Sequence, residues 1–160
     1  MGYKFGTKSI TRLGGVHPDL VDVFTNAIEI SKIDFGISCG VRSKKEQARL
    51  VASGASKTMN SKHIPQEVDG FSHAIDIFCY LDGRLSWELP CYWKAGDAIL
   101  KASREKGVKL RWGACWHIYN LLHLDHHKKS CEELCMEYTD LRRSQGKTPF
   151  IDSPHWELGK

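Results

Sequence analysis

The chain has 160 residues, of which 41% are hydrophobic and 26% charged, a size and composition typical of one ordinary globular domain. No stretch of about 18 consecutive apolar residues is present, which excludes a transmembrane helix, and the N-terminus lacks the apolar segment of a secretory signal, so we expect synthesis and retention in a cytoplasm. The net charge of +4 comes from scattered basic residues, whereas nucleic-acid binding needs a concentrated basic face, so we expect no nucleic-acid partner.

Along the chain, the sequence predicts helices and short strands with clear end signals. Apolar residues recur at three-four spacing over the first helix. A capping pattern at Ser43 and Glu46 begins the second helix, Gly54 ends it, and Gly107 and Gly146 end the two later helices. The predicted elements are a helix over 18–31, a strand over 34–39, a helix over 43–53, a polar loop over 54–72, a strand over 74–80, a helix over 90–107, a strand over 108–112, a helix over 130–145 and a strand over 156–158.

These elements lack a regular strand–helix–strand alternation. The pattern favours an α+β fold in which a small, mostly antiparallel sheet packs with helices. No repeat, low-complexity segment or linker divides the chain, so we expect one domain over residues 1–160. The six cysteines include no Cys-x-x-Cys pair, and without a secretory signal we expect them to be free thiols.

Three residues from different predicted elements have the chemistry of a catalytic zinc site. His63 lies in a polar loop, Asp76 interrupts an apolar strand, and His155 precedes the last strand. A buried carboxylate is costly unless it is paired or bound to a metal, and two imidazoles with one carboxylate leave zinc an open position for water. An alternative stays open at this point, since a loop histidine is usually exposed and a buried aspartate is usually paired with arginine or backbone N–H groups.

Several segments along the chain carry a recognisable combination of motifs. They are Phe5-Gly6 to Ser9, Gly15 to Leu20, Gly40-Val41-Arg42, Ser61-Lys62-His63, Ala74-Ile75-Asp76 and Asp152 to Leu158. In this order and spacing they resemble the zinc peptidases that include D,D-carboxypeptidases, D-Ala-D-Ala dipeptidases and the L-alanyl-D-glutamate endopeptidases of phages. The resemblance covers nearly the whole chain and implies a hedgehog/D,D-peptidase-like fold.

The resemblance also implies roles for single residues. It makes His63, Asp76 and His155 the ligands of one catalytic zinc ion. Asp152 matches the general base that activates water, and Arg42 matches an arginine that contacts the substrate and stabilises the charged intermediate.

Substrate contacts are expected from the neighbours of these residues. Ser61 matches a serine near the substrate, and the positions of Trp116 and Trp156 predict that they wall the cleft. Cys115 stands where many relatives have an acid, which leaves a change in substrate contacts open.

Two further groups could bind a metal. His73 rivals His63 as a ligand, but side chains alternate along a strand, so His73 and Asp76 should point to opposite faces. Residues 117–146 hold four histidines, together with Cys131 and Cys135. A structural metal site is conceivable there, but exposed histidines and core-facing thiols are the preferred interpretation.

The resemblance implies hydrolysis of a peptide bond in bacterial peptidoglycan stem peptides, most simply the L-Ala-D-Glu bond, by a phage endolysin that lyses its host. A D,D-carboxypeptidase acting on D-Ala-D-Ala ends is one alternative. A zinc-containing binding module without activity, as in hedgehog domains, is another, although Asp152 argues against it because a binder needs no base. We expect a monomer without membrane insertion that accumulates in the host cytoplasm and reaches the wall after membrane permeabilisation.

Overall fold

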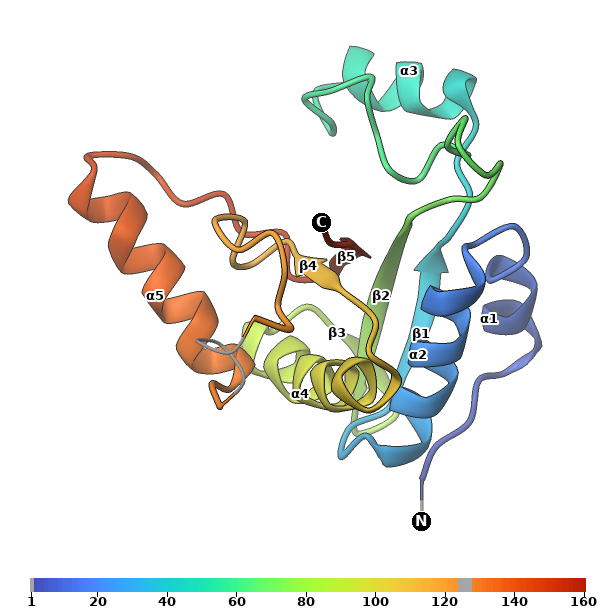
Figure 1. The fold of residues 1–160 in the computed structure, drawn as a ribbon, viewed down its shortest axis with the longest axis horizontal. Helices are drawn as coiled ribbons and strands as arrows, with labels where there is room; N and C mark the ends of the chain where they lie inside the picture. Colours follow the sequence, from blue (N-terminus) through green and yellow to red (C-terminus); the bar gives the residue numbers. More distant parts are fainter. Residues whose placement is uncertain (1, 124–127) are drawn as a thin grey trace.

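The computed structural model describes residues 2–123 and 128–160. Its helices and strands follow one another in the irregular order expected of an α+β fold (Figure 1). They are α1 (Thr7–Arg12), α2 (Pro18–Ile30), β1 (Phe35–Cys39), α3 (Lys44–Ala52), β2 (Ala74–Leu81), β3 (Arg84–Ser86), α4 (Leu89–Lys106), β4 (Leu110–Trp112), α5 (Cys131–Ser144) and β5 (His155–Leu158). The predicted α+β class is confirmed.

A small sheet lies at the centre of the molecule, with strand order β1-β2-β5-β4 and with β3 paired to β2 (Figure 1). Every named strand pair is antiparallel, which confirms the predicted sheet type. The register sets Asp76 opposite His155 on β5 and opposite Cys39 on β1. Because directly opposed residues share one face of a sheet, these three side chains lie on the same face.

The other face of the sheet belongs to the hydrophobic core. Trp156 on β5 is fully buried, stacks on Trp112 at 5.2 Å and meets the ring of Phe24 on α2 edge-on. Helices α2 and α4 pack against each other, and α4 also contacts β2. The apolar stripe predicted for the first helix is buried, as its periodicity indicated.

Helix α3 and the loop that follows it stand apart from the other helices, on the side of the sheet away from α4 (Figure 1). The helix begins as predicted, since Ser43 Oγ accepts a hydrogen bond from the Glu46 backbone N–H at 3.1 Å. The returning loop is joined to the start of α2, where the backbone N–H of His17 donates to Ser72 O at 2.9 Å. This loop contributes Ser61 and His63 to the site described below.

Two short elements, α1 and β3, were not predicted. They contain six and three residues, too few to show a period in the sequence. Tertiary contacts stabilise α1, because Ser9 Oγ accepts from the Ile37 backbone N–H and Arg12 donates to the Ile37 carbonyl, each at 3.0 Å.

The cysteines are all free thiols, as expected. Cys131 and Cys135 are buried in the core, which agrees with the preferred interpretation of residues 117–146. His117 and His123 are exposed, whereas His126 and His127 lie outside the described residues. Among the described residues, no helix is both long and apolar enough to cross a membrane.

Candidate active site

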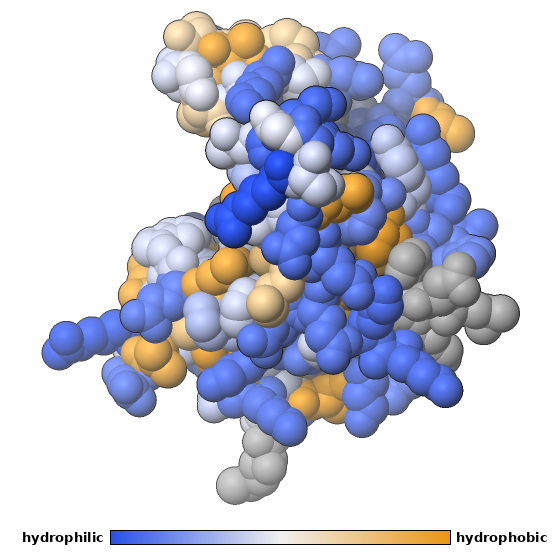
Figure 2. All heavy atoms as spheres, turned by 90° about the vertical axis from the view of Figure 1, so that its left-hand side faces the viewer, coloured by the Kyte–Doolittle hydropathy of each residue, from blue (hydrophilic) through white to orange (hydrophobic). Residues whose placement is uncertain are grey.

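A cavity of about 600 Å³ lies between the loop after α3 and the sheet edge formed by β5 and the segment before it. Figure 2 shows the molecule hollowed between its upper part, which contains α3, and the body below. Most of the residues expected at the site line this cavity: Arg42, Ser61, His63, Asp76, Trp116, Asp152 and His155. The structure therefore brings together residues from five separate segments of the chain.

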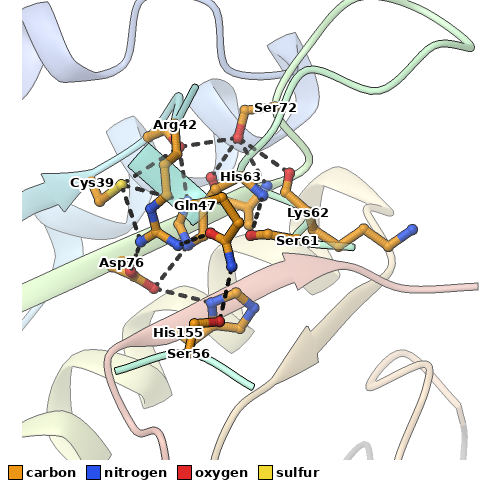
Figure 3. Close-up of polar contacts among 12 residues, drawn as sticks. Cys39, Arg42, Gln47, Ser56, Ser61, Lys62, His63, Ser72, Asp76 and His155 are labelled. Atoms are coloured by element: carbon orange, nitrogen blue, oxygen red, sulfur yellow. Dashed lines mark hydrogen bonds and ion pairs between the residues drawn. The ribbon is translucent and has the colours of Figure 1, made fainter. Parts of the chain in front are cut away.

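The two histidines converge on one oxygen of Asp76 (Figure 3). Asp76 Oδ1 lies 3.2 Å from His63 Nε2 and 3.0 Å from His155 Nδ1. The two imidazole rings meet nearly edge-on, with centroids 5.2 Å apart. Two ring nitrogens and a carboxylate oxygen are donor atoms of the kind that bind zinc.

His63 is oriented for metal binding by its other ring nitrogen. Its Nδ1 lies 2.8 Å from the Gly40 carbonyl, so Nδ1 carries the proton and donates it there. Nε2 therefore faces Asp76 and is the nitrogen left to bind a metal once it gives up its proton. This nitrogen is buried and has no hydrogen-bond partner, although an unpaired buried polar atom is costly. A cation between His63 Nε2 and Asp76 would satisfy both groups, so the donor set fits a metal.

His155 has a similar outer contact. Its Nε2 lies 3.0 Å from Glu157 Oε2, which leaves Nδ1 to face Asp76. Glu157 is itself buried, and its second oxygen lies 3.6 Å from Arg111 Nη1. A carboxylate behind a ligand histidine fixes the ring and its tautomer. The alternation along β5 that pairs His155 with Glu157 is visible in the sequence, but their contact is not.

Cys39 is a further candidate ligand, since its sulfur, His63 and Asp76 place donor atoms within 4.8 Å of one another. Its Sγ approaches His63 at Nδ1, at 3.7 Å, on the side of the ring that faces Gly40. His155, on β5, instead lies next to Asp76 Oδ1, which is the oxygen that His63 Nε2 also approaches. The geometry therefore favours His155 over Cys39 as the third member of the set.

Opposite charges dominate the electrostatics of this group. Burial lowers the pKa of His63, but the adjacent carboxylate of Asp76 outweighs it and raises the pKa to about 10. Burial likewise lowers the pKa of His155, while contacts with Asp76 and Glu157 raise it to about 9. Burial raises the pKa of Asp76, yet the hydrogen bond with His155 and the close approach of His63 hold it well below its usual range. The site thus keeps a carboxylate and attracts positive charge.

Asp152 lies at the edge of the same group. Burial raises the pKa of its carboxyl, and the nearby charge of Asp76 raises it further. Its backbone is fixed on both sides, since its N–H donates to Gly113 O at 2.8 Å and its carbonyl accepts from the His155 N–H at 3.0 Å. A side chain at Gly113 would collide with the Asp152 backbone, which explains the glycine there. The sequence did not reveal this role of Gly113.

Arg42 enters the cavity from the segment after β1 (Figure 3). Its Nη2 lies 3.5 Å from Asp76 Oδ2, and its Nη1 donates to Gln47 Oε1 at 2.9 Å. Gln47 is fully buried on α3, and its amide donates to Ser56 Oγ at 2.8 Å and to Thr58 O at 2.6 Å. Gln47 was missed in the sequence, where only its place inside a charged helix could have marked it as unusual.

Of the other residues expected near the substrate, some line the cavity and others are buried in the core. Ser61 and Trp116 line the cavity, and Trp116 stacks on Phe150 with ring centroids 6.3 Å apart. Trp156 was expected to wall the cleft, and this is wrong, because it alternates with His155 along β5 and points into the core. Cys115 is also buried and does not line the cavity.

His73, the rival ligand, is not part of this group. Its Nε2 lies 2.7 Å from Asp69 Oδ2, away from Asp76. This placement agrees with the prediction that His73 and Asp76 point to opposite faces.

Known proteins resemble this chain over most of its length. Residues 1–138 match the model of a family described as phage L-alanyl-D-glutamate peptidase. The chain is 36% identical over 121 residues to the L-alanyl-D-glutamate peptidase of Escherichia phage T5, which spans 73% of this chain and 84% of that protein. The crystal structure of the L-Ala D-Glu endopeptidase ChiX of Serratia marcescens matches with a TM-score of 0.69 and 29% identity, over 98% of this chain and 90% of that one.

Proposed function

This chain belongs to the phage L-alanyl-D-glutamate peptidase family, and we propose that it hydrolyses the L-Ala-D-Glu bond of peptidoglycan stem peptides with one zinc ion held by His63, Asp76 and His155. The observation that carries the proposal is the convergence of both histidines on Asp76 Oδ1 in a cavity that Asp152 also lines. A bound zinc ion supplies a Lewis acid that polarises the scissile carbonyl and makes water more acidic.

Asp152 acts as the general base in this proposal. Its carboxylate takes a proton from the attacking water and later donates it to the nitrogen of the leaving D-Glu residue. The raised pKa of Asp152 suits the first step, since a carboxylate whose conjugate acid has a higher pKa is a better proton acceptor. Its backbone hydrogen bonds to Gly113 and from His155 hold it beside the ligand group.

Arg42 stabilises the negative charge that develops on the carbonyl oxygen. Its guanidinium already faces the cavity and is held between Asp76 and Gln47, so little reorganisation is needed when the substrate binds. Ser61 and Trp116 line the cavity, and in this proposal they contact the stem peptide. We infer that the chain works as a monomer on the cell wall.

The proposal is tested by removing and restoring the metal. Protein treated with a chelator should not cleave purified peptidoglycan, and zinc should restore cleavage. His63→Ala should stay inactive at the same zinc concentration, while His123→Gln, at an exposed histidine outside the cavity, should behave as the wild type. Full activity of the chelated protein, or of His63→Ala, would contradict the proposed site.

A further inference from the structure

A second group of two histidines and one carboxylate lies outside the catalytic cavity. His17 caps the start of α2, and Asp69 and His73 belong to the loop that joins α3 to β2. Their donor atoms lie within 4.8 Å of one another. We propose that this group, hereafter the His17 cluster (His17, Asp69 and His73), binds a second transition-metal ion such as zinc, which ties the loop between His63 and Asp76 to α2.

The distances suit such an ion. Asp69 Oδ2 lies 2.7 Å from His73 Nε2 and 3.7 Å from His17 Nε2. Ligands at a zinc bond length of about 2.0–2.1 Å in a tetrahedron are about 3.3 Å apart, which falls between these two values. The side chains are 18–27% exposed, so an ion can enter from solvent and keep a water ligand.

The cluster is assembled before any metal binds. The Phe71 N–H donates to Asp69 Oδ1 at 3.0 Å, which leaves Oδ2 to face the histidines. The His17 N–H donates to Ser72 O at 2.9 Å, and the His73 N–H donates to Lys62 O at 2.8 Å. The backbone therefore already fixes all three ligand positions, and metal binding costs little ordering entropy. The hydrogen bond from Phe71 also lowers the pKa of Asp69, which keeps it a carboxylate.

Two protons must move when the metal binds. His73 Nε2 lies 2.7 Å from the Asp69 carboxylate and donates a proton to it, so this proton must move to Nδ1 before Nε2 can bind the ion. His17 Nδ1 accepts the N–H of Asp19 at 3.1 Å, so the neutral ring carries its proton on Nε2. Coordination through Nε2 shifts that proton to Nδ1, which lies 3.9 Å from Asp19 Oδ2. Asp19 would then support His17 as Glu157 supports His155. Zinc binding at the His17 cluster therefore breaks the hydrogen bond from the Asp19 N–H to His17 Nδ1, which caps α2. Because this cap is lost, the cluster should bind zinc more weakly than the catalytic site.

Zinc stoichiometry distinguishes the two sites, and this test does not depend on the proposed activity. Wild-type protein, stripped and then dialysed against zinc, should hold two ions per chain by mass spectrometry of the metal content. His73→Gln, Asp69→Asn and His63→Ala should each hold one, and the His63→Ala/His73→Gln double variant should hold none. His123→Gln serves as the matched surface control and should hold two.

Two further readouts separate a metal site from a structural role. The zinc-dependent rise in Tm should persist in His63→Ala and shrink in His63→Ala/His73→Gln. Asp19→Asn should weaken the second site about 10- to 100-fold, as expected when a carboxylate behind a ligand histidine is lost. His73→Gln should keep its hydrolytic activity. One zinc per chain in the wild type, unchanged by His73→Gln, would overturn the inference, and loss of activity in His73→Gln would make His73 a catalytic ligand instead.

Discussion

Replacing Gln47 by methionine should remove hydrogen bonds that orient Arg42 and that hold the loop after α3. The buried amide accepts from Arg42 and donates to Ser56 and Thr58, so methionine of similar length removes three hydrogen bonds. The charged bond is worth about 1.5–3 kcal/mol and each neutral one about 1 kcal/mol, a sum of about 3.5–5 kcal/mol. Water that reaches the loop should reduce the net loss to about 2–3 kcal/mol.

The free energy of unfolding of zinc-free protein in urea measures this loss, and Gln145→Met, at an exposed glutamine, is the matched control. In kinetics on soluble peptidoglycan fragments, we expect kcat/KM to fall about 10- to 100-fold because Arg42 loses its fixed orientation. Gln47→Glu separates the two effects, since it keeps the acceptor for Arg42 and loses the donors to the loop. A Gln47→Met protein as stable and as active as the wild type would refute the reasoning.

Three other perturbations have clear expected results. Asp152→Asn should lower kcat by about two to four orders of magnitude while zinc content stays unchanged, and an active variant would remove Asp152 from the mechanism. Glu157→Gln should weaken zinc binding about 10- to 100-fold in a chelator competition, because His155 loses the carboxylate that orients it; unchanged affinity would contradict that role. In metal-free protein the raised pKa of His63 contributes stability that is complete below about pH 6.5 and is lost as the pH rises through about 10. Urea unfolding from pH 6 to 10 should therefore show a steeper loss for the wild type than for His63→Ala, and parallel curves would be the contrary result.

Much of the fold follows from local signals in the sequence. Periodicity and caps placed α2, α3, α4 and α5 within a few residues, because Ser43, Gly107 and similar positions mark helix ends directly. Elements α1 and β3 escaped prediction because hydrogen bonds to other parts of the chain form them rather than a pattern of their own. The single-domain organisation stays a prediction.

The site was predictable where residue type and motif order carry the information. His63, Asp76, His155, Asp152 and Arg42 come together as the motifs indicated. Their roles stay predictions until the variants are measured.

Other parts of the site depend on three-dimensional proximity. Gln47 and Gly113 act through contacts that no motif marks, and the contact between His155 and Glu157 depends on side-chain rotamers. Trp156 was misplaced because its neighbour in the sequence, His155, points to the other face of the sheet. Side chains alternate between the two faces of a strand, a rule that was applied above to His73 and Asp76. Applied to β5, the same rule predicts that Trp156 and His155 point to opposite faces.

The central claim is a zinc-dependent cut between L-Ala and D-Glu, and the most direct measurement is mass spectrometry of peptidoglycan fragments released by the zinc-loaded protein, with a chelated control. The account predicts new N-terminal D-Glu ends that vanish with the chelator. Release of free D-Ala, cleavage that survives the chelator, or no cleavage at all would contradict it.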